Sequence, residues 1–306
     1  MVIRNRLKVV FAKFGGLDVK RYRLIAIDID GTLLDSRHKV SKYTKEIIQR
    51  AVNEDITVTL STGRMFRSAQ MVADEIELDV PLITYNGALV KNSASGEIYS
   101  HQTIDPDVGD AMMCLLEKRE LHYHVYIDEC LYVPKLTEKT KIYAKRSGVP
   151  TRPLSEVSLR DCSGASKFLV MGDPDKLDET AIFLQEELGD HIRAAKSHPI
   201  YLEIVHSKAS KGGALERLAK ELTIPREAVM ALGDQQNDLD MIRFAGLGIA
   251  MKNAAEELKF EADYIAGSND EDGAAKAIAS LALELDKKIF TDHTQQEERL
   301  YGMERS

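Results

Sequence analysis

The segment Asp28-Ile29-Asp30-Gly31-Thr32-Leu33 follows directly on the apolar run 24–27. That run, Leu-Ile-Ala-Ile, predicts a buried strand of a parallel sheet. Two carboxylates, Asp28 and Asp30, stand where the strand ends, and Gly31 lets the chain turn sharply away. In open α/β sheets, ligands bind at the carboxyl ends of the strands. The segment therefore predicts an α/β sheet with a ligand site at its two aspartates.

Size and charge restrict the classes of protein. The 306 residues, 44% of them hydrophobic, are enough for two domain cores. The formal net charge of −8 argues against a nucleic-acid partner, which would require a basic surface. Apolar runs stay far below the roughly 18 residues of a membrane span, so we expect no membrane partner. An acidic chain that binds phosphate must concentrate positive charge locally, through a metal ion or a lysine.

The cysteines and the two chain ends give further expectations. Cys114, Cys130 and Cys162 are widely spaced and form no Cys-x-x-Cys pattern. Together with the lack of a secretory signal pattern, this spacing predicts a cytoplasmic protein. Residues 1–20 are expected to be a disordered extension, and residues 291–306 a polar tail. The oligomeric state cannot be read from the sequence.

Alternating strand and helix patterns predict a doubly wound parallel sheet over residues 21–87 and 199–290. The expected core strands are 23–28, 56–61, 82–84, 228–232 and 247–250, and the expected core helices are 41–53, 65–77, 212–222, 237–245 and 273–285. Residues 88–198 lack this regular alternation and predict an inserted α+β domain. Its expected elements are strands 97–103, 122–127 and 131–133 and helices 108–118 and 175–188, with a hairpin turn at Asp128-Glu129.

Three further segments carry polar side chains at the ends of strands or at the start of a helix. Thr62 lies in Ser-Thr-Gly-Arg after the strand 56–61, where a threonine is more often a cap or turn residue. Lys211 opens a helix, which favours anion binding, although most lysines are solvated surface residues. Asp234 and Asp238 follow the strand 228–232, and capping explains Asp238 as well as function does. Each segment alone is a modest signal.

In this order the four segments resemble the four signature motifs of the haloacid dehalogenase superfamily, across roughly residues 22–285. Thr62-Gly63-Arg64, Tyr85-Asn86-Gly87 and 233–238 (Gly-Asp-Gln-Gln-Asn-Asp) resemble the Cof-type phosphatase branch. Only 31 residues separate Asp30 from Thr62, whereas 148 separate Thr62 from Lys211. The spacing places the inserted domain after the second motif, as in the class IIB cap of that branch, and Asn86-Gly87 is the expected hinge.

The resemblance implies a Mg²⁺-dependent phosphatase that acts on small soluble phosphomonoesters through an aspartyl-phosphate. Asp28 would be the nucleophile and Asp30 the general acid and base. The implied metal ligands are Asp28, the backbone carbonyl of Asp30, Asp234 and, through a water or by orienting its neighbours, Asp238. The implied phosphate-binding residues are Thr62, Gly63, Lys211 and Asn237. Arg64 is either a substrate contact or a salt-bridge partner.

The same motifs are compatible with two other functions. A phosphomutase would use the same chemistry, and a non-catalytic sensor of phosphorylated metabolites would keep the fold without turnover. A dinucleotide enzyme is rejected because Gly246-x-Gly248 precedes a strand and lacks the required fingerprint. His122 and His124 share one face of a strand, where packing explains them better than ligand binding. His198, Tyr201 and Glu203 are further candidates to face a substrate.

Overall fold

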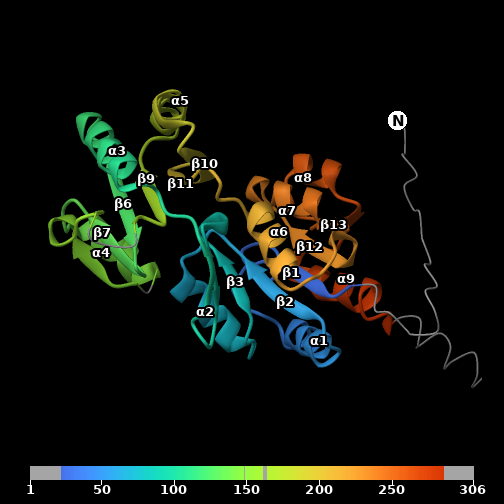
Figure 1. Ribbon diagram of the computed structural model, residues 1–306. Coiled ribbons are helices and arrows are strands. Elements are labelled where there is room, and N and C mark those ends of the chain that lie inside the picture. Colours follow the sequence, from blue (N-terminus) through green and yellow to red (C-terminus); the bar gives the residue numbers. More distant parts are fainter. Residues whose placement is uncertain (1–21, 148, 161–163, 286–306) are drawn as a thin grey trace, which may run out of the picture.

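The computed structural model describes residues 22–147, 149–160 and 164–285. The expected extension at residues 1–20, the expected tail at 291–306 and Cys162 lie outside these ranges. The described residues form one sheet of eight strands and one of six. Figure 1 shows the two sheets as neighbouring bodies, with the second inserted into the chain of the first.

The first sheet is mostly parallel and forms the core of the larger body. Its strands, in spatial order, are β14 (Tyr264–Ile265), β13 (Leu247–Ala250), β12 (Val229–Gly233), β1 (Leu24–Asp28), β2 (Thr57–Ser61), β3 (Pro81–Thr84), β4 (Leu89–Asn92) and β5 (Ile98–His101). All neighbours from β14 to β3 pair in parallel, and β4 and β5 add an antiparallel edge. The predicted α/β fold with a doubly wound sheet is confirmed.

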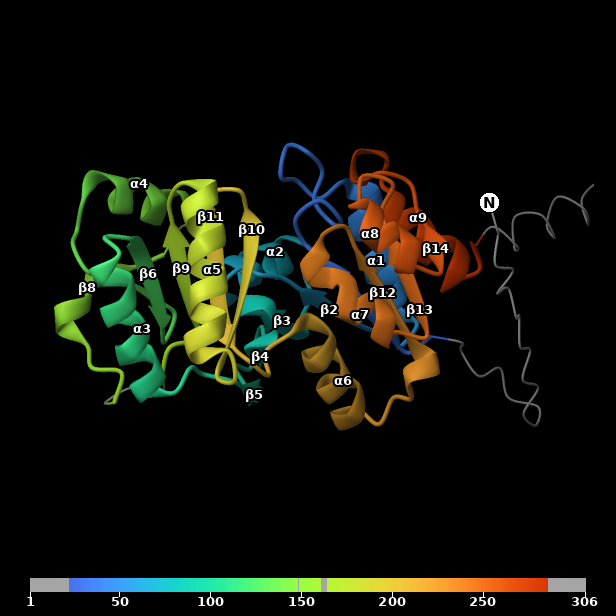
Figure 2. The ribbon, with the colours of Figure 1, turned by 90° about the horizontal axis from the view of Figure 1, so that it is seen from above.

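Helices cover both faces of this sheet, as Figures 1 and 2 show. One face carries α1 (Lys42–Asn53), α2 (Phe66–Glu75) and α9 (Gly273–Leu281), and the other carries α6 (Lys211–Glu221), α7 (Leu239–Phe244) and α8 (Glu256–Glu261). The central strand β1 is therefore buried along its whole length, which explains its unbroken apolar sequence. Helix α1 begins where predicted, because the Ser41 hydroxyl accepts a hydrogen bond from the Thr44 N–H.

The second sheet has helices mainly on one face. Its strands, in spatial order, are β10 (Ile192–His198), β11 (Tyr201–His206), β9 (Lys167–Met171), β6 (His122–Ile127), β7 (Cys130–Val133) and β8 (Thr151–Pro153). Helices α3 (Pro106–Lys118) and α5 (Pro174–Leu188) bury an apolar core against it, and α4 (Glu138–Ser147) reaches its other face. The hairpin predicted at Asp128-Glu129 is confirmed: both residues have positive φ and Ile127 pairs with Cys130.

The expected boundaries of the insert differ from the boundaries of the sheets. Strands β4 and β5 lie after residue 88 but extend the first sheet, β4 on β3 and β5 on β4. Strand β11 lies after residue 198 but belongs to the second sheet. The chain therefore crosses to the second sheet after His101 and returns after His206. Tyr85, Asn86 and Gly87 form a tight 3₁₀ connection between β3 and β4. The crossing therefore does not lie at Asn86-Gly87, because both sides of this connection stay in one sheet, and a hinge at these residues stays a prediction.

Two helix predictions need smaller changes. The helix expected at 237–245 begins as a 3₁₀ turn (Gln236–Asp238) and continues as α7, and the helix expected at 273–285 ends at Leu281. Among the described residues, no helix combines the length and the apolar character needed to cross a membrane.

Candidate active site

The site is built where two central strands of the first sheet end side by side. Strands β1 and β12 are parallel neighbours, and Ile27 pairs with Leu232. Asp28 is the last residue of β1, and Asp234 directly follows β12. The short 3₁₀ turn after β12 then brings Asp238 back toward both carboxylates. Residues more than 200 positions apart in the sequence thus meet at one edge of the sheet, as the motifs predicted.

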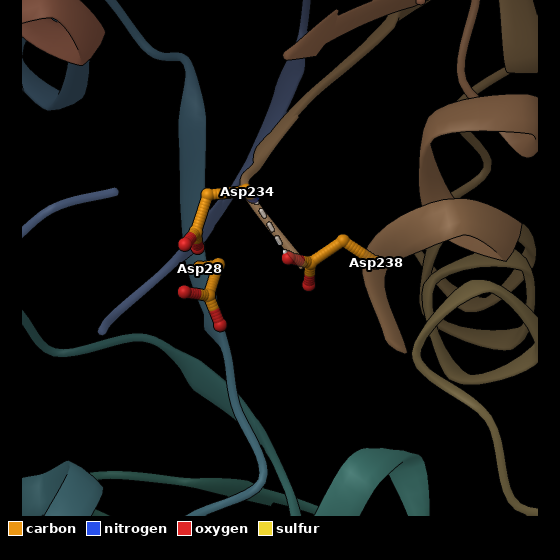
Figure 3. A group of neighbouring side chains, drawn as sticks. All are labelled: Asp28, Asp234 and Asp238. Carbon is orange, nitrogen blue, oxygen red and sulfur yellow. Dashed lines mark hydrogen bonds between the residues drawn. The ribbon is translucent and has the colours of Figure 1, made fainter. Parts of the chain in front are cut away.

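These three aspartates form a tight buried group. One oxygen from each of Asp28, Asp234 and Asp238 lies within 4.8 Å of the other two (Figure 3). Their exposed fractions are only 5%, 3% and 0%. Buried carboxylates require paired charge or metal ligation, because removal of an isolated charge from water is costly.

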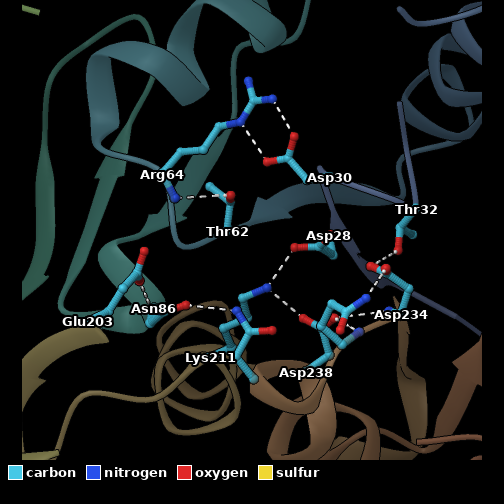
Figure 4. Close-up of polar contacts among 12 residues, drawn as sticks. Asp28, Asp30, Thr32, Thr62, Arg64, Asn86, Glu203, Lys211, Asp234 and Asp238 are labelled. Atoms are coloured by element: carbon cyan, nitrogen blue, oxygen red, sulfur yellow. Dashed lines mark hydrogen bonds and ion pairs between the residues drawn. The ribbon is translucent and has the colours of Figure 1, made fainter. Parts of the chain in front are cut away.

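Lys211 supplies positive charge to this group from the first turn of α6. Its Nζ donates hydrogen bonds to Asp28 Oδ1 at 2.6 Å and to Asp238 Oδ1 at 2.5 Å (Figure 4). The Ser210 hydroxyl caps the helix by accepting from the Gly213 N–H, which fixes where α6 begins. The lysine side chain is 1% exposed, so the predicted lysine is part of the buried site and not a surface residue.

Three ionised carboxylates and one ammonium leave the group with an excess of two negative charges. Burial raises the pKa of Asp28 well above its usual range; Lys211 opposes this rise, and Asp238 and Asp234 add to it. Burial and the Asp238 charge raise the pKa of Asp234 to about 6. Burial alone would lower the pKa of Lys211, but Asp238 and Asp28 raise it. The donor set and its charge therefore fit a divalent metal ion held by oxygen ligands.

Neighbouring groups hold Asp234 and Asp238 in place. The Thr32 hydroxyl donates to Asp234 Oδ1 at 3.2 Å, and the Gln235 amide donates to Asp234 Oδ2 at 3.0 Å. Asp238 Oδ2 accepts from the N–H groups of Asp234 and Gln235. Gly31 has φ +83°, and a Cβ there would collide with the Asp234 carboxylate. Sequence reasoning assigned no role to Thr32 or Gln235, although Thr32 lies within the first motif.

Asp30 lies apart from this group and has a different partner. Arg64 holds it with two hydrogen bonds, from Nε to Oδ2 at 2.7 Å and from Nη2 to Oδ1 at 2.5 Å. The Asp30 side chain is 47% exposed, so it lies at the open side of the site. Figure 4 shows it turned away from Asp28 and toward Arg64. Of the two alternatives for Arg64, the structure shows the salt bridge.

Thr62 and Gly63 follow β2, the neighbour of β1. The buried Thr62 hydroxyl oxygen accepts from the Arg64 N–H at 3.1 Å, so its own proton stays available to donate. The Thr62 carbonyl accepts from the Asn86 N–H, which ties this loop to the one after β3. Both loops thus reach the edge of the sheet at which Asp28 ends.

Asn86 and Asn237 join in a chain of side-chain hydrogen bonds that reaches the second sheet. The Asn237 amide donates to Asn86 Oδ1 at 2.9 Å, and the Asn86 amide donates to Glu203 Oε2 at 2.6 Å. Glu203 belongs to β11, so this predicted candidate does face the site. Gly87 packs against the backbone of Ser210, which links the loop after β3 to the start of α6.

The remaining candidates form an aromatic cluster on the second sheet. His122 and His124 lie with their Nε2 atoms 3.0 Å apart, and burial together with His122 lowers the pKa of His124 to about 3. His124 packs edge-on against Tyr143 of α4, which contacts Tyr201. A buried neutral imidazole against aromatic rings agrees with the predicted packing role. His198 contacts Tyr201 at the far end of this cluster.

Comparison with known proteins identifies the family. The family model for haloacid dehalogenase-like hydrolases matches residues 25–278. The chain belongs to this family, as its motifs predicted, and to the Cof-type phosphatases within it.

Individual relatives match most of this chain and almost all of their own length. The 5-amino-6-(5-phospho-D-ribitylamino)uracil phosphatase YwtE of Bacillus subtilis is 31% identical over 85% of this chain and 98% of its own. A haloacid dehalogenase-like hydrolase from Bacteroides thetaiotaomicron is 31% identical, with a TM-score of 0.77 over 85% of this chain and 99% of that one. The class IIB sugar phosphatase BT4131 shares the fold at 24% identity, with a TM-score of 0.71 over 84% and 97%.

Proposed function

We propose that the chain is a Mg²⁺-dependent phosphatase that hydrolyses small soluble phosphomonoesters, of the sugar-phosphate type, through a phosphoryl group carried on Asp28. The observation that carries this proposal is the buried group of three carboxylates, two of which share one ammonium. Asp28, Asp234 and the Asp30 carbonyl would hold the ion, with Asp238 orienting its neighbours. Bound there, Mg²⁺ would neutralise charge on the nucleophile and on the phosphoryl oxygens.

Asp28 is the proposed nucleophile. Lys211 binds its Oδ1 atom, which leaves Oδ2 to attack phosphorus. A bond forms between Oδ2 and phosphorus as the bond to the ester oxygen breaks, and the leaving group departs with the electron pair. One difficult displacement is thereby divided into two easier ones.

Asp30 is the proposed general acid and base. It would give a proton to the departing ester oxygen and then take one from the water that hydrolyses the acyl phosphate. Its half-exposed position, turned away from the three carboxylates, suits a group that must reach the leaving group and the water. Arg64 holds this carboxylate in one orientation through two parallel hydrogen bonds.

Thr62, Gly63, Lys211 and Asn237 are proposed to bind the transferring phosphoryl oxygens. The Thr62 hydroxyl proton is available because its oxygen already accepts from Arg64. Donors fixed before the reaction stabilise the charge that develops on these oxygens, which is the main requirement in phosphoryl transfer.

The proposed substrate class has two supports. The names of YwtE and BT4131 describe phosphatases of a ribityl phosphate and of sugar phosphates. The second support is the second sheet, which contacts the site through Glu203. A domain therefore borders the space for the leaving group, and this arrangement disfavours macromolecular substrates.

A cytoplasmic location stays a prediction. Within the described part of the chain, Cys114 and Cys130 are both free.

Phosphate release from a panel of small phosphomonoesters tests this function. The panel should be run with Mg²⁺, with a chelator, and with Asp28→Asn protein. We expect release only with Mg²⁺ and intact Asp28. Little inorganic phosphate together with isomerised product would show a phosphomutase, and tight binding without turnover would show a sensor; either result would overturn the proposal.

A further inference from the structure

The second sheet carries a buried ion pair on the face nearest the site. The proposed chemistry does not use this pair. Lys167 of β9 and Glu203 of β11 lie on adjacent strands, with Nζ and Oε1 3.2 Å apart. Their side chains are only 5% and 12% exposed. Both side chains also contact the first sheet, at the loops that follow β2 and β3.

Lys167 binds the backbone of the first loop. Its Nζ donates to the Gly63 carbonyl at 2.8 Å, and the ammonium lies 4.9 Å from the centroid of the Tyr126 ring. The N–H of the same peptide group belongs to Arg64, and it donates a hydrogen bond to the Thr62 hydroxyl oxygen. The peptide between Gly63 and Arg64 is therefore fixed at both ends, at one end by a residue of the second sheet.

Glu203 binds the second loop. Its Oε2 accepts from the Asn86 amide at 2.6 Å, while Oε1 accepts from Ser197 and Lys167. Asn86 in turn accepts from Asn237. Asn86 has φ 54°, between two residues that also have positive φ, a conformation that persists only where contacts hold it. Glu203 supplies one of those contacts from outside the first sheet.

We propose that Lys167 and Glu203 are positioning residues that fix the loops after β2 and β3 when the second sheet is docked, and through them the phosphate-binding groups of Thr62 and Asn237. Lys167 orients the Gly63–Arg64 peptide and thereby the Thr62 hydroxyl. Glu203 orients Asn86 and thereby the Asn237 amide. Both charged groups already bond to partners within the protein, which distinguishes them from leaving-group contacts. This role rests on the proposed phosphatase function and deepens it, because it couples the docked insert to the phosphoryl half of the site.

The Lys167→Met and Glu203→Gln variants test this role through two readouts. The first is the affinity for inorganic phosphate with Mg²⁺ present, by titration calorimetry at a temperature where thermal unfolding shows each variant to be folded. We expect each variant to weaken this affinity about tenfold. The second is hydrolysis of p-nitrophenyl phosphate, where misplaced donors should lower kcat between about 10- and 100-fold. Lys167→Arg keeps a cationic donor and should restore part of both.

Lys196→Met is the matched control. Lys196 also lies in the second sheet and also pairs with a carboxylate, Asp178, but its bonds stay within the insert. We expect wild-type phosphate affinity and kcat from this variant. Wild-type affinity and kcat in folded Lys167→Met or Glu203→Gln protein would overturn the positioning role while leaving the phosphatase proposal intact. Failure of wild-type protein to bind phosphate or to hydrolyse the ester with Mg²⁺ would instead overturn the phosphatase proposal.

Discussion

Lys211 Nζ lies 2.6 Å from Asp28 Oδ1, so the first residue of α6 neutralises part of the charge at the end of β1, 183 positions earlier in the chain. The same ammonium lies 2.5 Å from Asp238 Oδ1. One cation therefore holds two of the three buried carboxylates. The fold and the proposed chemistry depend on the same contact.

Replacement of this lysine should damage stability as well as activity. Lys211→Met leaves the buried carboxylates without their cation, and breaking such a pair from one side costs about 3 to 5 kcal/mol. We expect a loss of this size in the free energy of unfolding of metal-free protein, measured by urea titration. Lys220→Met, at the exposed end of the same helix, should change it by less than about 0.5 kcal/mol. Equal stabilities of the two variants would contradict the assigned charge balance.

The two steps of the proposed reaction can be separated with Asp30→Asn. A p-nitrophenolate leaving group needs no proton, so Asp28 should still take up the phosphoryl group. Without a base to activate water, the acyl phosphate should accumulate, and intact-protein mass spectrometry should detect one added phosphoryl group. The double variant with Asp28→Asn is the control and should carry none. Rapid steady turnover by Asp30→Asn protein would refute the acid–base assignment.

The parts predictable from sequence are those fixed by local pattern. The apolar runs of β1 and β12 are buried on both faces, and each ends in carboxylates, so both the strands and the edge that bears the site follow from the pattern. Ser41 likewise marks the start of α1 through a local hydrogen bond. In each case the decisive contacts lie within a few residues or repeat along a strand.

The parts missed by sequence reasoning depend on distant partners. Strand β4 looks like any short strand until its antiparallel pairing with β3 places it in the first sheet. Strands β9 and β11 were not predicted, although Glu203 of β11 was a candidate to face a substrate. The burial of the charged Lys167 and Glu203 is explained by their pairing with each other, across 36 residues, and by the loops of the first sheet. A pattern within one segment does not contain that information.

The close packing of Gly87 against Ser210, in the connection after β3, can be tested by substitution. Gly87 has φ +91°, and a Cβ there would collide with the Ser210 carbonyl. Gly87→Ala should therefore push α6 and Lys211 away from the site, and we expect a loss of stability of about 3 kcal/mol or more. Gly96 is the matched control: its φ is +74°, but its nearest neighbour for a Cβ is Lys91 Cε at 3.7 Å. Gly96→Ala should cost only about 1 kcal/mol. Equal losses, measured by thermal unfolding, would show that the contact with Ser210 is unimportant.

The pKa of Asp234 predicts how pH and Mg²⁺ act together. Because folding raises this pKa from its usual value of 3.8 to about 6, the folded state binds more protons than the unfolded state between these values. The contribution of Asp234 to the stability of metal-free protein should therefore decrease as the pH rises through this window and stay low above it. Mg²⁺ requires the ionised carboxylate, so its stabilising effect should be small at pH 5 and large at pH 7.5. Thermal unfolding with Mg²⁺ and with chelator at both pH values measures this difference, and Asp234→Asn should reduce it strongly. A Mg²⁺ effect that is the same at both pH values in wild-type protein would contradict ligation by Asp234.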